Sequence, residues 1–226
     1  IEGETIARKI LRDPEYAHAR SVLAFQCGEA LARIHQIPRK RLPELNAVTP
    51  RQQLEQYMAT YDGYNYPHPT FEAAFKWLEQ RLPDTSDLTL VHGDFRNGNL
   101  IVGPEGIRAV LDWELAHIGD PVQDLGYISA NVWRFGLPKP VGGFGEYADL
   151  LAGYASVCGA APSMESIHYW QVHAALSWGM VCLLMLQMYR SGQDASLERA
   201  AIGRRLSEAE IDLLLLLDGE PGGESS

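Results

Sequence analysis

The sequence predicts a mainly helical α+β fold in which a helical body carries one small three-stranded β insertion near its middle. Apolar residues recur at helical spacing along most of the chain. Between residues 88 and 112 the pattern changes to short runs of β-branched residues and leucine, and residues 103–106 form a turn between the last two runs. The 226 residues are 46% hydrophobic and 21% charged, which excludes a disordered chain, collagen and a coiled coil.

The expected elements follow from periodicity and from breaks at proline and glycine. The first long helix begins near Pro14 and ends before Pro38, because proline is tolerated in a first turn but not in a helix interior. The expected helices are 14–37, 50–61, 70–82, 122–132, 145–157, 163–190 and 195–217, the last with a break. The expected strands are 88–92, 99–102 and 107–112.

Charge and cysteine content limit the class of partner. The formal net charge of −10 argues against nucleic acid, because binding phosphate backbones needs a basic face. Three cysteines without a CxxC spacing predict neither a disulfide framework nor a zinc site, and they fit a reducing cytoplasm. The longest near-apolar stretch, residues 174–188, is too short to span a bilayer. We therefore expect a cytoplasmic protein that binds neither nucleic acid nor membrane.

Residues with chemical potential are concentrated between positions 92 and 124. Asp94 follows a predicted strand in a glycine-rich loop, Asn99 begins the next strand, and Asp112 ends the strand after that. A hairpin would bring the Asn99 amide oxygen beside the Asp112 carboxylate. Two such oxygen ligands suit Mg²⁺, which keeps its other positions for water and phosphate oxygens. Asp94 would then be a base beside the metal that accepts a hydroxyl proton.

Three motifs in order resemble the aminoglycoside phosphotransferase and choline kinase family of the protein-kinase-like fold. They are HGDFRNGN at residues 92–99, DWE at residues 112–114 and GDPVQDLG at residues 119–126. The resemblance implies the C-terminal lobe of that fold, with a catalytic loop at 92–99 and a metal-binding segment at 112–114. It implies an ATP-dependent phosphotransferase that uses Mg²⁺, and it leaves GTP open as the donor.

The resemblance also assigns roles to residues. It implies that Asp94 is the catalytic base and that Arg96 lies near the transferred phosphoryl group. It implies that Asn99 and Asp112 hold Mg²⁺ between the nucleotide phosphates. Ile101 occupies the position of the apolar floor under the adenine ring.

Three further residues have supporting or undecided roles. Asp124 resembles the aspartate that braces the catalytic loop, and His92 is expected to pack and hydrogen-bond beneath that loop. Glu114 is left open between an acid that supports the site and a surface residue. Asp120, before Pro121, is expected to cap a helix.

The acceptor is expected to be a small molecule with a hydroxyl group. Gly93 stands where protein kinases have an arginine, and only eight residues separate Asp112 from Pro121, which leaves no activation loop. Residues 3–5 and 203–217 resemble a branch of the family that is fused to acyl-CoA dehydrogenases in some eukaryotic proteins, and that branch implies hydroxyacyl acceptors as one class. The family lines its acceptor pocket with late helices, so these residues are expected in the core or in that pocket: Trp133, Arg134, Tyr169, Trp170, Trp178, Met180, Met185 and Met188.

The domain expectation is a kinase-like C-terminal lobe over residues 1–217 and a flexible tail over 218–226. We expect the N-terminal lobe, with its Gly-rich loop and lysine, to be absent from this chain and to be its partner. The only glycine cluster, residues 142–145, is interpreted as a loop before a helix. The isolated chain is expected to be inactive and to expose apolar residues around Ile101 and Leu111, which would favour a homo-oligomer or contact with the missing lobe.

Two other functions share part of this pattern. A metallophosphoesterase would share the Gly93-Asp94 and Gly98-Asn99 pairs, but it needs metal-binding histidines and an early D-x-H that the sequence lacks. A non-catalytic kinase-like binding or regulatory module stays open as the alternative.

Overall fold

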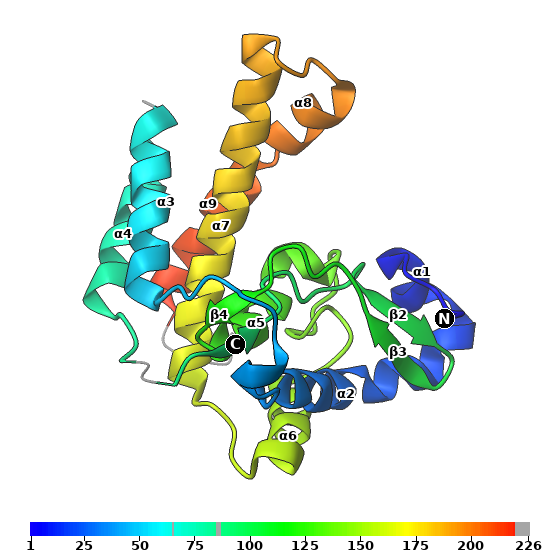
Figure 1. Ribbon diagram of the computed structural model, residues 1–226. Helices are drawn as coiled ribbons and strands as arrows, with labels where there is room; N and C mark the ends of the chain where they lie inside the picture. The colour runs from blue at the N-terminus through cyan, green and yellow to red at the C-terminus, as the bar shows by residue number, and fades with distance from the viewer. Residues whose placement is uncertain (65, 85–86, 220–226) are drawn as a thin grey trace.

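A computed structural model describes residues 1–64, 66–84 and 87–219 and shows a mainly helical protein with small antiparallel sheets (Figure 1). The first half contains α1 (Ala7–Arg12), α2 (Ala17–His35), α3 (Pro50–Tyr64), α4 (Pro69–Gln80), β1 (Thr89–Val91), β2 (Leu100–Gly103) and β3 (Gly106–Val110). The second half contains β4 (His117–Gly119), α5 (Val122–Ile128), α6 (Tyr147–Cys158), α7 (Met164–Ser191), α8 (Leu197–Gly203) and α9 (Leu206–Asp218). Short 3₁₀ turns are η1 (Pro14–Tyr16), η2 (Arg39–Arg41) and η3 (Asn131–Arg134).

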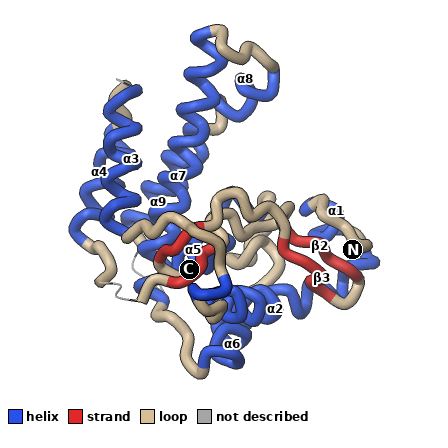
Figure 2. The backbone as a smooth tube through the Cα atoms, viewed as in Figure 1, coloured by secondary structure: helices blue, strands red, loops and turns tan. Residues whose placement is uncertain are grey.

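The expected fold class is confirmed, and the expected strands 88–92, 99–102 and 107–112 are present as β1, β2 and β3, but the fourth strand, β4, was not expected. The described residues form four short strands in two separate antiparallel pairs, β2–β3 and β1–β4 (Figure 2). Leu100 pairs with Val110 in the first sheet, and Leu90 pairs with Ile118 in the second. Strand β4 is only three residues long, which is too short to show an alternating pattern, so no periodicity marked it. The catalytic loop expected at 92–99 therefore leaves one sheet and enters the other.

Several helix boundaries also differ from expectation. Helix α5 ends at Ile128 instead of residue 132, because Ala130 is extended and the chain then enters η3. The expected break in the last helix separates α8 from α9 at Arg204 and Arg205. Asp218, which was expected in the tail, is the last residue of α9, and residues 220–226 lie outside the described part. The Asp120 carboxylate accepts a hydrogen bond from the Val122 N–H at 2.9 Å, as a helix cap does.

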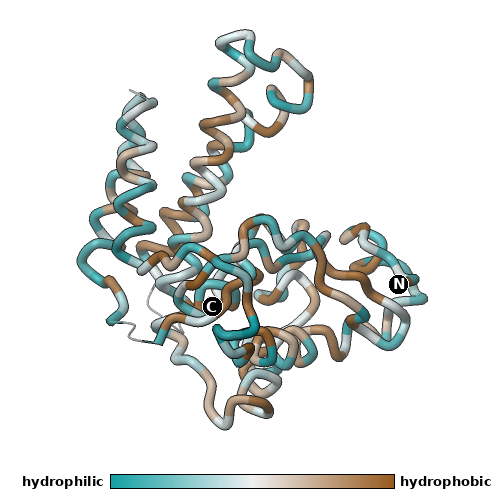
Figure 3. Tube along the Cα trace, viewed as in Figure 1, coloured by the Kyte–Doolittle hydropathy of each residue, from teal (hydrophilic) through white to brown (hydrophobic). Residues whose placement is uncertain are grey.

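Two hydrophobic cores divide the molecule. The first joins α2, α6, the 92–99 loop and β2, with Leu23, Phe95 and Leu150 fully buried. The second joins α3, α4, α7 and α9, with Phe71 and Leu176 fully buried. Figure 1 shows α3 beside α7 on one side of the molecule and β2–β3 beside α1 on the other. In Figure 3, α3 is largely hydrophilic and α7 is more hydrophobic, in agreement with the deeper burial of α7.

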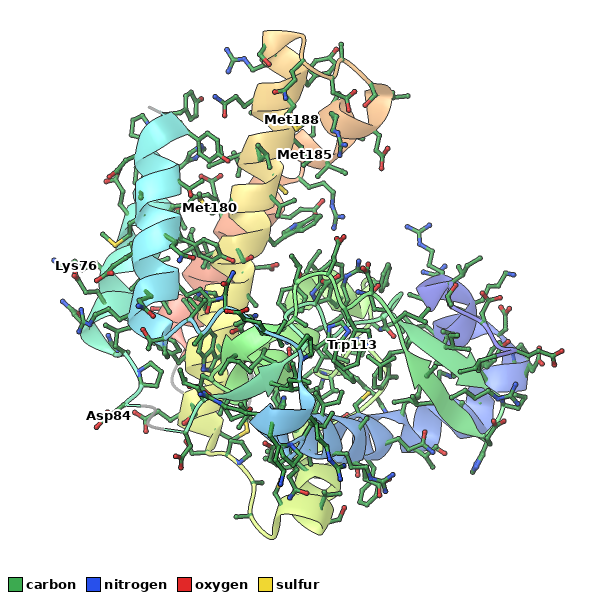
Figure 4. All side chains as sticks on the ribbon, viewed as in Figure 1. Lys76, Asp84, Trp113, Met180, Met185 and Met188 are labelled. Atoms are coloured by element: carbon green, nitrogen blue, oxygen red, sulfur yellow. The ribbon has the colours of Figure 1, made fainter. Side chains whose placement is uncertain are left out.

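Helix α7 extends well beyond the apolar stretch 174–188 that sequence analysis considered. By length and composition alone, its 28 residues could cross a membrane. Half of its most apolar window is buried inside the protein, and buried polar residues such as His168, Gln171 and His173 lie along it. A core helix meets the same length and composition criterion. Figure 4 shows Met180, Met185 and Met188 spaced along it; Met180 is buried in the second core.

Two glycines allow α2 and α6 to cross closely. A Cβ at Gly153 would collide with the backbone oxygen of Phe25, and a Cβ at Gly28 would collide with that of Leu150. These are backbone atoms, so a side-chain rotation cannot relieve the collision. The crossing matters for the 92–99 loop because α2 carries His35. His35 contacts Asp124, whose carboxylate accepts hydrogen bonds from the backbone of His92 and Gly93.

We predict that Gly153→Ala lowers the free energy of unfolding by about 1–3 kcal/mol, as overpacking of a helix contact does. In thermal denaturation this corresponds to a loss of several degrees in Tm. The control is Gly63→Ala in α3, where a Cβ meets nothing within 4 Å. It should stabilise the protein by about 0.5–1 kcal/mol because alanine is the better helix former. Equal Tm values for the two variants would contradict the close crossing.

Candidate active site

Asp94, Arg96 and Asn99 converge in the loop between β1 and β2. The Arg96 Nε–H donates to Asp94 Oδ1 at 2.9 Å. The Asn99 side-chain amide donates to Asp94 Oδ2 at 2.6 Å and to the Asp94 main-chain oxygen at 2.9 Å. Each carboxylate oxygen therefore has a donor from the same loop. The Asp94 side chain is 13% exposed, so one approach from outside stays open.

Tyr127 is a further neighbour of Asp94 that sequence analysis missed. Burial raises the pKa of Tyr127 well above its ordinary value, and the charge and hydrogen bond of Asp94 raise it further. The phenol therefore stays protonated and can donate to the carboxylate. The available signal was its position in α5, one helical turn after Asp124.

Asp124 anchors the loop from below. Its Oδ2 accepts from the His92 N–H at 2.8 Å, and its Oδ1 accepts from the Gly93 N–H at 2.9 Å. His35 Nε2 lies 3.2 Å from Oδ2, and His35 Nδ1 lies 3.0 Å from the Tyr154 hydroxyl. The loop is thereby connected through one carboxylate to α5, α2 and α6. These hydrogen bonds hold the backbone of His92 and Gly93 against α5, and His35 is a partner that the sequence did not reveal.

The pKa of Asp124 results from opposing effects. Full burial by itself would raise this pKa, because it disfavours the charged form. The hydrogen bond and charge of His35, together with the two backbone N–H donors of His92 and Gly93, outweigh burial and leave the pKa below its ordinary value. Asp124 is therefore a buried anion held by three donors.

His92 connects the loop to the segment that carries Asp112. Its Nδ1 accepts from the Asp94 N–H at 3.2 Å, so its Nε2 carries the proton and donates to the Leu111 carbonyl at 2.8 Å. The ring is fully buried and packs edge-on against Phe95. His92 thus lies beneath the loop and fixes the residue before Asp112.

Asn99 and Asp112 lie on neighbouring rungs at the end of the β2–β3 ladder. The Leu111 N–H donates to the Asn99 main-chain oxygen at 2.8 Å, and Asp112 is the next residue. Asp112 has a left-handed backbone, with φ of 64°, which aspartate tolerates better than most residues. Its side chain is exposed and has no ion pair among the described residues.

The oxygen donors of this pair fit a hard cation. Because the Asn99 amide donates through Nδ2, its Oδ1 is left without a hydrogen bond among the described residues. Within the same residues, no group of three or more His, Cys, Asp and Glu gathers into a metal cluster. Mg²⁺ is commonly held by one or two protein oxygens together with water and substrate phosphates. The site therefore suits a cation that arrives with a phosphate ligand.

Apolar residues beside this pair are uncovered. Leu111, Trp113 and Leu115 are 36%, 40% and 55% exposed (Trp113 is labelled in Figure 4). The exposure expected around Leu111 is therefore present, whereas Ile101 in β2, opposite Ala109, is half-buried. Glu114 is exposed and has no hydrogen bond or ion pair among the described residues, as a surface residue would.

The glycine cluster 142–145 supports the site, which sequence analysis did not anticipate. Asn97 of the catalytic loop is buried, and its amide donates to the Gly142 oxygen at 2.5 Å and to the Trp133 oxygen at 3.2 Å. Gly142 and Gly143 have φ of 54° and 79°. A Cβ at Gly143 would press on the Arg134 backbone. These glycines let the 141–145 turn pack beneath η3.

Three aromatic side chains, Tyr127, Trp133 and Trp178, pack together next to Arg96, the ion-pair partner of Asp94. The Trp133 ring has Arg96 over its face at 4.5 Å and contacts the rings of Tyr127 and Trp178. Trp133 also lines a cavity of about 690 Å³ between α1, η3 and α9. Of the other late residues expected in the core or the acceptor pocket, Tyr169 and Trp170 lie in the second core. Arg134 binds the Ser129 carbonyl.

The fold matches the C-terminal portion of solved kinase-like phosphotransferases. A putative aminoglycoside phosphotransferase from Ralstonia eutropha aligns over 96% of this chain and 70% of its own, with a TM-score of 0.74 and 18% identity. A choline/ethanolamine kinase family protein from Mesorhizobium loti aligns over 97% and 72%, with a TM-score of 0.61 and 16% identity. Spectinomycin phosphotransferase, solved with ADP and spectinomycin, aligns over 96% and 69%, with a TM-score of 0.58 and 14% identity.

Sequence comparison defines the family. Residues 1–159 match the model of the phosphotransferase enzyme family, and the chain belongs to this family. Among curated proteins, acyl-CoA dehydrogenase family member 11 of Pongo abelii is 29% identical over 194 residues, which are 77% of this chain and 25% of that protein. The human protein of the same name is 32% identical over 138 residues, 56% of this chain and 18% of that protein. The chain thus spans a quarter or less of the length of these relatives.

We predict that Asp124→Asn lowers the free energy of unfolding by about 2 kcal/mol near neutral pH, because buried N–H donors lose their charged acceptor. The native pKa of Asp124 is lowered, so its contribution is fully present above the ordinary aspartate value of about 4 and is lost as pH falls through the native value. The gap between wild type and variant should therefore narrow below about pH 4. Denaturant unfolding across pH measures it, with exposed Asp149→Asn as control. A gap independent of pH would contradict this account.

Proposed function

We propose that this site transfers a phosphoryl group from ATP to a hydroxyl group of a small molecule, with Mg²⁺ as cofactor. The observation that carries the proposal is the placement of Asp94 beside Asn99, in a loop that His92 and Asp124 hold against the Asp112 segment. Family membership supports the reaction class, and the ADP in one solved relative supports a nucleotide donor. GTP is the other donor to be tested.

Asp94 is the proposed base. Its carboxylate is partly exposed and accepts hydrogen bonds from Arg96 and Asn99, which fix its orientation, and the buried Tyr127 phenol lies near it. A base in a fixed orientation can receive the proton of an acceptor hydroxyl as the new bond to phosphorus forms. Arg96 adds a positive charge beside this point, where it can stabilise the negative charge of the transferred group.

Asn99 and Asp112 are the residues that would hold Mg²⁺. When bound, the ion supplies charge neutralisation for the phosphate oxygens, which is much of the stabilisation in this class of reaction. Ile101, with the uncovered side chains of Leu111 and Trp113, offers an apolar surface suited to the nucleotide base or to a partner lobe.

The acceptor is proposed to be a hydroxyacyl compound. The support is the sequence similarity to relatives named as acyl-CoA dehydrogenase family members and the cavity beside Trp133. The cavity of about 690 Å³ is lined by apolar Phe135 and Ile211 and by the charged residues Arg8, Arg205, Glu208 and Asp212. Arg205 is paired with Glu208 at 2.9 Å, so Arg8 would receive the anionic part of an acceptor whose apolar part lies against Phe135 and Ile211.

We predict that Asp94→Asn lowers kcat by about 10²- to 10⁴-fold and leaves nucleotide affinity nearly unchanged, because the base contacts the acceptor hydroxyl. Asp112→Ala should abolish transfer, and Arg96→Ala should fall between the two. The measurement is nucleotide consumption by the full-length protein with a panel of hydroxylated small molecules and hydroxyacyl thioesters, together with nucleotide titrations. Exposed Asp149→Ala is the matched control.

Full turnover by Asp94→Asn would remove Asp94 from the reaction. Nucleotide binding without turnover on any acceptor would favour the alternative, a kinase-like binding or regulatory module.

A further inference from the structure

We propose that Trp133 is a positioning residue for Asp94 and that it acts through Arg96. The inference rests on the proposed function of Asp94 as the base. It assigns a role to a residue of η3 that sequence analysis placed only among core or pocket candidates.

Arg96 is held on three sides. Its Nε–H donates to Asp94 Oδ1 at 2.9 Å, and its Nη1 donates to the Asn97 main-chain oxygen at 3.1 Å. The guanidinium carbon lies 4.5 Å from the centre of the Trp133 ring. A guanidinium over an indole face is attracted by the negative face of the ring. The long side chain of Arg96 is therefore fixed in the one orientation that reaches Asp94.

The catalytic loop in turn fixes Trp133. The Asn97 amide donates to the Trp133 main-chain oxygen at 3.2 Å, and Tyr127 and Trp178 pack against the ring at 5.6 and 5.8 Å between centroids. Asn97 follows Arg96 directly in the chain. Asn97 therefore holds the backbone of Trp133, and the Trp133 ring in turn holds the side chain of Arg96.

The contacts among Trp133, Arg96 and Asn97 determine how the Asp94 carboxylate is oriented. The Arg96 side chain is 25% exposed. Without the Trp133 ring, its guanidinium could adopt more rotamers and would be more fully hydrated. Asp94 Oδ1 would then lose its fixed donor, and the carboxylate would be held in this loop through Oδ2 alone, by the Asn99 amide, which restricts its orientation less. A base contributes to rate only while it is within hydrogen-bond reach of the proton that it removes. Loss of the ring should therefore lower kcat and leave the KM for nucleotide unchanged.

Trp133 also lines the cavity beside the site, so a change of the ring can alter the KM for the acceptor directly. Comparing kcat at saturating acceptor separates the two effects. If Trp133 only contacted the acceptor, its substitution would change the KM for the acceptor. The change in that KM would then be the same with Arg96 present or replaced.

The test is a double-mutant cycle in the full-length protein, with an acceptor that the wild type phosphorylates. Trp133→Met removes the aromatic face and retains much of the volume, and we expect kcat to fall about tenfold, within the range of a partly buried cation–π contact. Trp133→Phe keeps an aromatic face and should restore most of kcat. In an Arg96→Ala background, Trp133→Met should cause no further loss. Trp133→Leu is a second removal of the ring, and Tm shows which variants remain folded.

The chain provides a matched control. Arg81, which directly follows α4, lies over the ring of Trp77 in α4 at the same distance of 4.5 Å. Trp77 packs on the second core, whereas Phe95, next to Asp94, lies in the first. Trp77→Met removes a ring that packs on the second core, so it should lower Tm and leave kcat unchanged. Equal losses of kcat from Trp133→Met in the wild-type and Arg96→Ala backgrounds would overturn the inference, and so would an unchanged kcat in Trp133→Met. Absence of transfer by the wild type would instead overturn the proposed function, and the inference with it.

Discussion

The buried carboxylate of Asp124 is the contact on which the site depends. Each oxygen accepts from one backbone N–H of the catalytic loop, and His35 completes the set. An unpaired charge at such depth would be unfavourable by several kcal/mol, so the three donors and the anion require one another. Helices α2, α5 and α6 pack into the first core around Asp124. The position of Asp94 is therefore determined by the packing of these helices and not by the local conformational preference of its loop.

His92 connects the proposed base, Asp94, with the segment that carries the proposed metal ligand Asp112. His92 accepts from the Asp94 backbone and donates to the Leu111 carbonyl, so a single buried ring spaces the base from Asp112. Asn99 also has two contacts to serve, because its Nδ2 donates to Asp94 while its Oδ1 accepts no hydrogen bond from the described residues and is the proposed ligand of the cation. The proposed base and the proposed metal ligands are thus positioned by the same few hydrogen bonds.

Much of the site could be predicted because its residues lie close together in sequence. The spacing of Asp94, Asn99 and Asp112 follows from one loop and one hairpin, and the helical body follows from apolar periodicity. What could not be predicted depends on contacts between distant segments. His35 reaches Asp124 from α2 and is itself held by the Tyr154 hydroxyl of α6, and Trp133 reaches Arg96 from η3. Strand β4 was missed because pairing with β1, not its own pattern, defines it. The glycines at 142 and 143 are needed for an approach to Asn97 and Arg134 that composition alone cannot show.

The most direct test of this account is the location of a bound cation. Crystals of the full-length protein with Mn²⁺ in place of Mg²⁺ and a non-hydrolysable ATP analogue would reveal the ion by its anomalous scattering. The account predicts one ion bound by the Asn99 side-chain oxygen, the Asp112 carboxylate and phosphate oxygens, with Asp94 facing away from the ion toward the acceptor side. An ion bound elsewhere, or a bound nucleotide whose phosphates lie away from Asn99 and Asp112, would contradict it.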